Sequence, residues 1–391
     1  MNKYGIALAA DSALTLGDGE KIYHHAKKLF DLKPGIPVGV MVYGSAEIMG
    51  MPWEIVIKQY ALTLGEKQFD RLEQYAENFF RFTEGAHSLF PEATQREWFR
   101  DTVGDYWDRE IIQPLTRKLK RLGRSTTQKN ISALAHILSK ENSAWERHPR
   151  LHRLDDAHGE RILATYGPIL EKLESHLFSH VALTQELLHK LRLTVKHMYT
   201  REWFAPDCQS GIVFAGMGET EPFPAILQYN IGSVAAGVLH YSLEDRAAIS
   251  REDSAIVVPF AQVDMINMFY RGIDDDLEQK LEGLVGKTIA LELGKTSNRM
   301  SDNQIERIKK QFSKALNQEI DRKYEAPLIA SVEALPRHDL AKMAEALINL
   351  TVLKRRMSVD QRETVGGQVD VAILAKGEGF VWVKSGSSQN R

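Results

Sequence analysis

Short apolar runs separated by turn-forming residues open the chain. Residues 5–11 read GIALAAD and are apolar at nearly every position, which is typical of a strand covered on both faces. Residues 26–32 and 37–45 are two further strand candidates, and the glycines and prolines between these runs predict tight turns. We therefore predict a β-rich region whose strands form a meander.

The hydrophobic period lengthens after residue 52. From residue 53 to residue 205, apolar residues recur every three or four positions, as in WEIVIKQYALTL and FDRLEQYAENFFRF. Strong helix formers dominate this stretch, and β-branched residues are sparse. We predict a large helical block whose tryptophan and phenylalanine side chains form its core.

Residues 206–385 return to a mixed pattern. SGIVFAGMG, PFPAILQYNIG and AAGVLHYSL predict strands, and three amphipathic stretches predict helices at 260–285, 303–329 and 338–357. GGQVDVAILAKGEGFVWVKS predicts a closing hairpin, and residues 386–391 have the composition of a disordered tail. Strand regions with segregated helices indicate an α+β protein with antiparallel sheets.

The composition is that of an ordinary globular protein and excludes several classes. The 391 residues carry a formal net charge of -2, so no overall basic field favours nucleic acid. Cys208 is the one cysteine, which leaves no intrachain disulfide and no cysteine-based zinc site and suits a reducing compartment. No apolar run has the length of a membrane helix, and the N-terminus lacks the features of a signal peptide. We expect a cytoplasmic protein without a membrane partner.

Three motifs in the first stretch occur together. They are GIALAADSALT from Gly5 to Thr15, Lys27-Lys28-Leu29, and Gly44-Ser45-Ala46. As a set they resemble the N-terminal region of proteasome β-type subunits, which are N-terminal-nucleophile (Ntn) hydrolases. The later SGIVFAGMGETEPFPAILQYN and the closing VGGQVDVAILAKGEGF are similar to that family's later strands. The helical block does not match the family and would replace a much shorter helical hairpin.

The resemblance implies a fold. Residues 1–52 and 206–385 would form the two parts of a four-layer αββα sandwich, with residues 53–205 as a helical insertion and 386–391 as a tail. Proteasome subunits assemble as rings, so we expect a homo-oligomer. The family needs no cofactor or metal.

The resemblance also implies a chemistry, the hydrolysis of amide bonds in a peptide or protein substrate. In this family a Thr, Ser or Cys at the mature N-terminus is the nucleophile, and its own α-amine is the general base. At the matching positions, Lys28 would lower the pKa of the nucleophile and Asp11 would pair with that lysine. The backbone N–H of Gly44 would stabilise the oxyanion.

Each of these three residues also has a plain structural interpretation. Asp11 can cap the turn that follows a strand. Lys27 and Lys28 can be solvated lysines at a strand edge, although alternation along a strand sends only one of them inward. Gly44 can serve only for the backbone angle of a strand-to-helix turn.

The chain departs from the family pattern at the nucleophile itself. Met1 to Tyr4 stand where the family has a whole strand that begins with the nucleophile, so the sequence as given would be inactive. Residues that support the family site are replaced here by Arg362, Val365 and the run 259–261. If the alignment is shifted by a few residues, Asp360 or Glu363 takes the place of the family's aspartate. One hypothesis places the true start upstream, and the alternative is a noncatalytic relative that acts as a scaffold or binds partners through its helical block.

Other polar clusters have simpler explanations. Asp274 to Asp276 fit the start of a helix better than a metal site. His24 and His25 would point to opposite faces of a strand, and His176 and His180 lack the glutamate of a zinc-peptidase motif. The basic run 117–129 is best explained as a solvated helix end, with nucleic-acid binding as a distant alternative.

Overall fold

The computed structural model describes residues 1–16, 21–23, 26–122, 126–151, 153–206, 209–261, 263–294, 301–357 and 366–385. Its strands are β1 (Ile6–Asp11), β2 (Leu14–Leu16), β3 (Lys21–Tyr23), β4 (Leu29–Asp31), β5 (Val38–Gly44), β6 (Glu47–Ile48), β7 (Met51–Pro52), β8 (Ser210–Gly216), β9 (Ala225–Ala235), β10 (Val238–Ala248), β11 (Val369–Ala375) and β12 (Gly379–Lys384). Its helices are α1 (Trp53–Leu64), α2 (Leu72–Gly85), α3 (Glu92–Trp107), α4 (Gln113–Leu122), α5 (Thr127–Trp145), α6 (Asp156–Leu177), α7 (Gln185–Met198), α8 (Asp264–Arg271), α9 (Asp275–Gly294), α10 (Asp302–Ile320), α11 (Ala326–Ala334) and α12 (Arg337–Met357), with π-helical turns η1 (Asp108–Ile112) and η2 (Asp321–Glu325).

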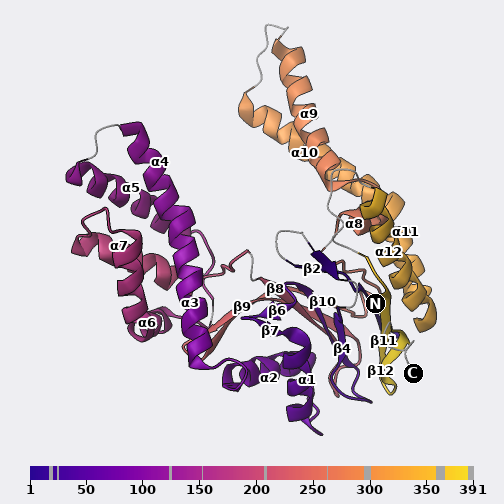
Figure 1. Cartoon of the computed structure of the whole chain (residues 1–391). Helices are drawn as coiled ribbons and strands as arrows, with labels where there is room; N and C mark the ends of the chain where they lie inside the picture. Colours follow the sequence, from indigo (N-terminus) through magenta and orange to yellow (C-terminus); the bar gives the residue numbers. More distant parts are fainter. Residues whose placement is uncertain are drawn as a thin grey trace.

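A five-stranded antiparallel sheet occupies the centre of the described chain (Figure 1). Its strand order is β10-β9-β8-β5-β4, so a strand from the start of the chain pairs with one that follows the helical block, in the register Val40↔Phe214. Helices α1 and α2 cover one face of this sheet, where Val56 and Tyr60 pack with Val40 and Phe214 in one apolar cluster. Burial of this apolar helix face holds both helices on the sheet.

A second, three-stranded antiparallel sheet has the order β1-β11-β12 and joins the two ends of the chain. In its register Leu8 lies opposite Ala372. Helix α12 packs on this sheet, and its Ala341 lies in an apolar cluster with Val371. Strand β1 is therefore an edge strand that is covered by a helix on one face.

The two sheets pack against each other through a shared apolar cluster. Leu8 and Leu374 from the small sheet lie in it with Met41 and Val213 from the large one. Gly39 lets the sheets approach, since a Cβ there would lie 2.8 Å from the Phe380 ring. The prediction of an α+β protein with antiparallel sheets is confirmed.

Helices α3 to α7 form a separate arm on one side of the sheets (Figure 1). This arm has its own core, in which Phe99, Trp107 and Tyr166 are fully buried, as the helical spacing predicts. Its core begins at α3, whereas α1 and α2, which we predicted to belong to the same helical block, pack on the sheet instead. Hydrophobic periodicity reveals the apolar face of a helix but not the surface that the face will cover.

Helices α9 and α10 project as a pair on the other side (Figure 1). The sequence pattern predicts one helix over 260–285, but Gly272 ends α8 in a left-handed conformation with φ of 71°. No helix in the described ranges is long and apolar enough to cross a membrane. The predicted features at His24, His25 and Cys208 and the predicted tail 386–391 lie outside the described residues.

We predict that acid destabilises the junction between the arm and the large sheet through His240. This side chain is 5% exposed, its Nε2 lies 3.2 Å from the Arg201 carbonyl oxygen, and burial lowers its pKa to about 4. Because the pKa in the unfolded chain is about 6.5, the contribution of His240 to the free energy of unfolding should fall by about 3 kcal/mol as the pH drops from 6.5 to 4. His158 and His197, whose pKa values are also lowered to about 4 by burial, add to the total decline. Urea unfolding at several pH values measures this slope.

The matched control is His240→Gln, whose amide can still donate to the Arg201 carbonyl but does not titrate. The decline over the same pH range should be shallower in this variant. An equal decline in both proteins would show that His240 does not cause it.

Candidate functional site

An ion pair joins Asp11, the last residue of β1, to Lys28, which directly precedes β4. The Lys28 ammonium donates to Asp11 Oδ1 at 2.8 Å. The two side chains are 13% and 24% exposed, so the pair is largely removed from solvent. Two of the three site residues that the motifs single out are thus in direct contact.

The second carboxylate oxygen of Asp11 ties down the backbone around it. Asp11 Oδ2 accepts hydrogen bonds from the N–H groups of Ala13, at 3.1 Å, and Gly366, at 3.0 Å. The hydroxyl of Ser12 accepts from the N–H of Gln368 at 2.9 Å. Asp11 therefore does hold a turn, as its plain structural interpretation requires, and it binds Lys28 as well.

The two neighbouring lysines lie in different surroundings. The Lys27 ammonium lies 5.5 Å from the centre of the Phe30 ring and 5.3 Å from that of Trp382. Only Lys28 reaches Asp11, and its carbonyl accepts from the N–H of Val42 at 2.9 Å, which fixes it beside β5. Regular alternation along a strand does not determine which of the two lysines points to Asp11, because β4 begins only at Leu29.

Gly44 ends β5, two residues beyond the contact with Lys28. Its φ of 77° lies in the left-handed region, and a Cβ would lie 2.8 Å from the Gln209 carbonyl oxygen. The loop that follows is held by the Ser210 hydroxyl, which accepts from Trp53 Nε1 at 2.9 Å and donates to the Ser45 carbonyl at 3.1 Å. The turn therefore needs glycine for its conformation and its space, whether or not its N–H meets an oxyanion.

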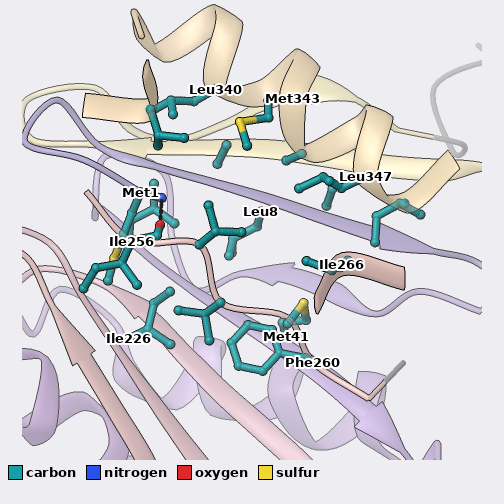
Figure 2. A pocket seen from close by; sticks show the side chains of 18 residues that line it. Met1, Leu8, Met41, Ile226, Ile256, Phe260, Ile266, Leu340, Met343 and Leu347 are labelled. Carbon is teal, nitrogen blue, oxygen red and sulfur yellow. Dashed lines mark hydrogen bonds between the residues drawn. The ribbon is translucent and has the colours of Figure 1, made fainter. Parts of the chain in front are cut away.

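An apolar groove runs along the free edge of β1 (Figure 2). It holds about 700 Å³, counting the part open to solvent, and lies between β1 and the extended segment 256–260, under α12. Leu8, Ile256, Phe260 and Leu347 are among its lining residues. In the described chain, β1 is a terminal strand of its sheet and residues 257–260 form no backbone–backbone hydrogen bond.

The first residues of the chain enter this groove at one end. Asn2 and Gly5 exchange two backbone hydrogen bonds, of 3.1 and 3.2 Å, around a two-residue turn that reverses the chain onto β1. Met1 likewise exchanges backbone hydrogen bonds with Ile256, one of them from its main-chain nitrogen at 2.7 Å. Asn2 is fully buried, and its side-chain amide donates to the carbonyls of Val332 and Leu335, both at 2.9 Å. Sequence patterns do not indicate this groove, because its two edges are far apart along the chain.

Among the remaining candidate residues, those that the structure describes add no further polar group to this site. Within the run 259–261, Phe260 lines the groove and Ala261 has a φ of 62°, which is unusual for a residue with a Cβ. Arg362, Val365, Asp360 and Glu363 lie outside the described residues. Asp274 accepts from the N–H of Leu277 at 3.1 Å, as a helix cap does.

Among the described residues, no group of three or more His, Cys, Asp or Glu side chains is placed to hold a metal ion.

No protein-family model matches the chain, and a search of curated proteins finds no match either.

We predict that the two partners in the ion pair differ in their effect on stability. Asp11→Ala removes the acceptor of two buried backbone N–H groups and should lower the free energy of unfolding by about 3 kcal/mol. Lys28→Met replaces the aliphatic stem of lysine with one of similar length and leaves the carboxylate its backbone donors, so it should cost about 1 kcal/mol. Urea unfolding of both variants tests the order, and equal losses would contradict it.

A second prediction separates steric from conformational strain at Gly44. Gly44→Ala should destabilise the protein by at least about 1 kcal/mol more than Gly50→Ala. The two glycines have φ values of 77° and 76°, but a Cβ at Gly50 would meet nothing within 4 Å. Thermal unfolding of the two variants gives the comparison, and similar losses would mean that the Gln209 carbonyl moves away at no cost.

Proposed function

We propose that this chain is an Ntn-type amide hydrolase whose nucleophile lies on a strand that precedes Met1. The observation that carries this proposal is the Asp11–Lys28 ion pair, whose Asp11 lies on β1 two residues beyond Ala9, a lining residue of the apolar groove. The packing order also supports it, since α1 and α2, the large sheet, the small sheet and α12 follow one another as in a four-layer αββα sandwich.

The register of the chain start indicates where such a strand would run. Asn2 pairs with Gly5 across an antiparallel hairpin. In this register, two residues lie opposite each other when their residue numbers add up to seven. A strand that continued upstream of Met1 in this register would place its fifth residue before Met1 opposite Asp11. On its other side the same strand would run beside residues 257–260 and could pair with their free backbone groups.

The chemistry then follows from the groups near that position. A threonine, serine or cysteine at the released N-terminus would supply the nucleophile, and its α-amine would accept the proton. The Lys28 ammonium would stabilise the developing alkoxide, while Asp11 holds the lysine in place. The N–H of Gly44 is the candidate donor to the oxyanion of a peptide or protein substrate.

We predict that the position of an added nucleophile decides activity. Four chains are prepared, each with an apolar extension that begins with threonine at the third, fifth, sixth or eighth position before Met1. A leader peptide is then cleaved off each chain, so that the threonine is the first residue and carries a free amine. Hydrolysis of fluorogenic peptide amides should occur only for the fifth or sixth position, which lies level with Asp11 or one residue beyond it. Alanine at the same positions is the matched control.

Lys28→Met in the active extended chain should lower the rate by about 100-fold or more, whereas Lys27→Met should leave it within about threefold. Activity that is insensitive to Lys28, or that is equal at all four positions, would overturn the proposed mechanism. The reading frame upstream of Met1 gives an independent test, because a stop codon directly before Met1 would exclude a native preceding strand.

A second candidate function, binding without catalysis, is favoured by a different observation. Both oxygens of Asp11 already accept hydrogen bonds that stabilise the fold, so the ion pair would persist without any reaction. The arm of α3 to α7 has a core of its own and would then carry the partner surface. Folded extended chains that hydrolyse nothing would favour this function.

A further inference from the structure

A three-walled pocket lies in the helical arm, remote in sequence from the Asp11 site. One wall is the face of α3 and η1 that carries Tyr106, Arg109 and Glu110, at spacings of three and four residues. The second is the face of α5 that carries Glu141 and Trp145. Trp203, in the segment after α7, closes the third side, and the pocket holds about 640 Å³, counting the part open to solvent.

A π-helical turn shapes the first wall. The turn η1 interrupts the helix between α3 and α4, and the N–H of Gln113 bonds to the carbonyl of Asp108, five residues back. Such a turn inserts one residue and so changes which side chains share a face. Glu110 lies within η1, on the stretch that faces Glu141.

Two carboxylates, Glu110 and Glu141, and one guanidinium, Arg109, line this pocket. In the described part of the chain, neither Glu110 nor Glu141 forms an ion pair, and the one hydrogen bond to the Glu141 carboxylate comes from the Tyr106 hydroxyl at 3.4 Å. Burial raises the pKa of Glu141 and the negative charge of Glu110 raises it further, while the Tyr106 hydrogen bond and the Lys140 ammonium act more weakly in the opposite direction. The two acids therefore repel each other, and a bound cation would relieve that repulsion.

The aromatic side chains form a rigid apolar wall next to these acids. The ring centres of Tyr106, Trp145 and Trp203 lie 5.6 to 5.7 Å apart in all three pairs. Trp145 Nε1 donates to the Tyr106 hydroxyl at 2.6 Å, which orients that hydroxyl toward Glu141. Trp145 is 3% and Tyr106 5% exposed, so they support the half-buried Trp203, which offers its ring to a ligand.

We propose that this pocket binds an alkylammonium group, supplied either by a free amine or by a lysine side chain of a peptide. Two unpaired carboxylates supply the charge, and the aromatic wall favours an organic cation with an alkyl stem over a hydrated metal ion. This inference is independent of the hydrolase proposed above, because none of its residues contacts the Asp11 site.

The test is titration of the full chain with cadaverine and, separately, with a lysine-containing tripeptide that is acetylated and amidated at its ends. Calorimetry gives the affinity, and tryptophan fluorescence reports on Trp145 and Trp203. The same tripeptide with acetyl-lysine should bind at least about tenfold more weakly, because it keeps the stem and loses the charge. Preference for cadaverine or for the peptide identifies the source of the ammonium group.

The variants Glu110→Gln and Glu141→Gln should each weaken amine binding at least about fivefold, and the matched control is Glu146→Gln, an exposed acid on the end of α5 outside the pocket. Circular dichroism verifies that each variant is folded. Should a pocket variant fail to fold, the acetyl-lysine comparison on the unmodified chain still decides. Equal binding of charged and acetylated peptides, or no binding of either amine, would overturn the proposal.

Discussion

The carboxylate of Asp11 is the point at which three distant segments of the chain meet. Through its two oxygens it binds Lys28, the N–H of Ala13 and the N–H of Gly366. A carboxylate that is largely removed from water must be compensated by such partners, because its lost hydration is costly. Strand β1, the approach to β4 and the approach to β11 are therefore fixed relative to one another by one side chain.

The parts of the fold that could be predicted are those that depend on local sequence patterns. The buried strands and the helical periodicity are local properties, so GIALAAD, VGVMVYG and the helices of the arm were recognised from the sequence. The structure brings Asp11 and Lys28 into contact, although plain alternation along the strand did not distinguish Lys28 from Lys27. That distinction depends on Val42, whose backbone holds Lys28 in place just before β4 begins.

The failures have a common physical cause, which is that local patterns do not specify long-range partners. Helices α1 and α2 have the same periodicity as those of the arm, yet they cover the large sheet. The groove beside β1 arises because residues 256–260 lie across from the start of the chain, held there by the two backbone hydrogen bonds between Met1 and Ile256. Nothing in either short stretch indicates the other.

The two candidate sites differ in the same respect. The Asp11 site requires segments from both ends of the chain, so it exists only when both sheets are formed. The pocket in the arm uses helix faces at spacings of three and four residues, together with one tryptophan beyond α7. Such spacing predicts a buried face equally well for a core and for a pocket, and the tryptophans of the arm were accordingly predicted as core. What distinguishes this pocket is that the carboxylates of Glu110 and Glu141 lie beside the rings and form no ion pair with any residue that the structure describes. That feature becomes visible only when α3, η1 and α5 lie side by side.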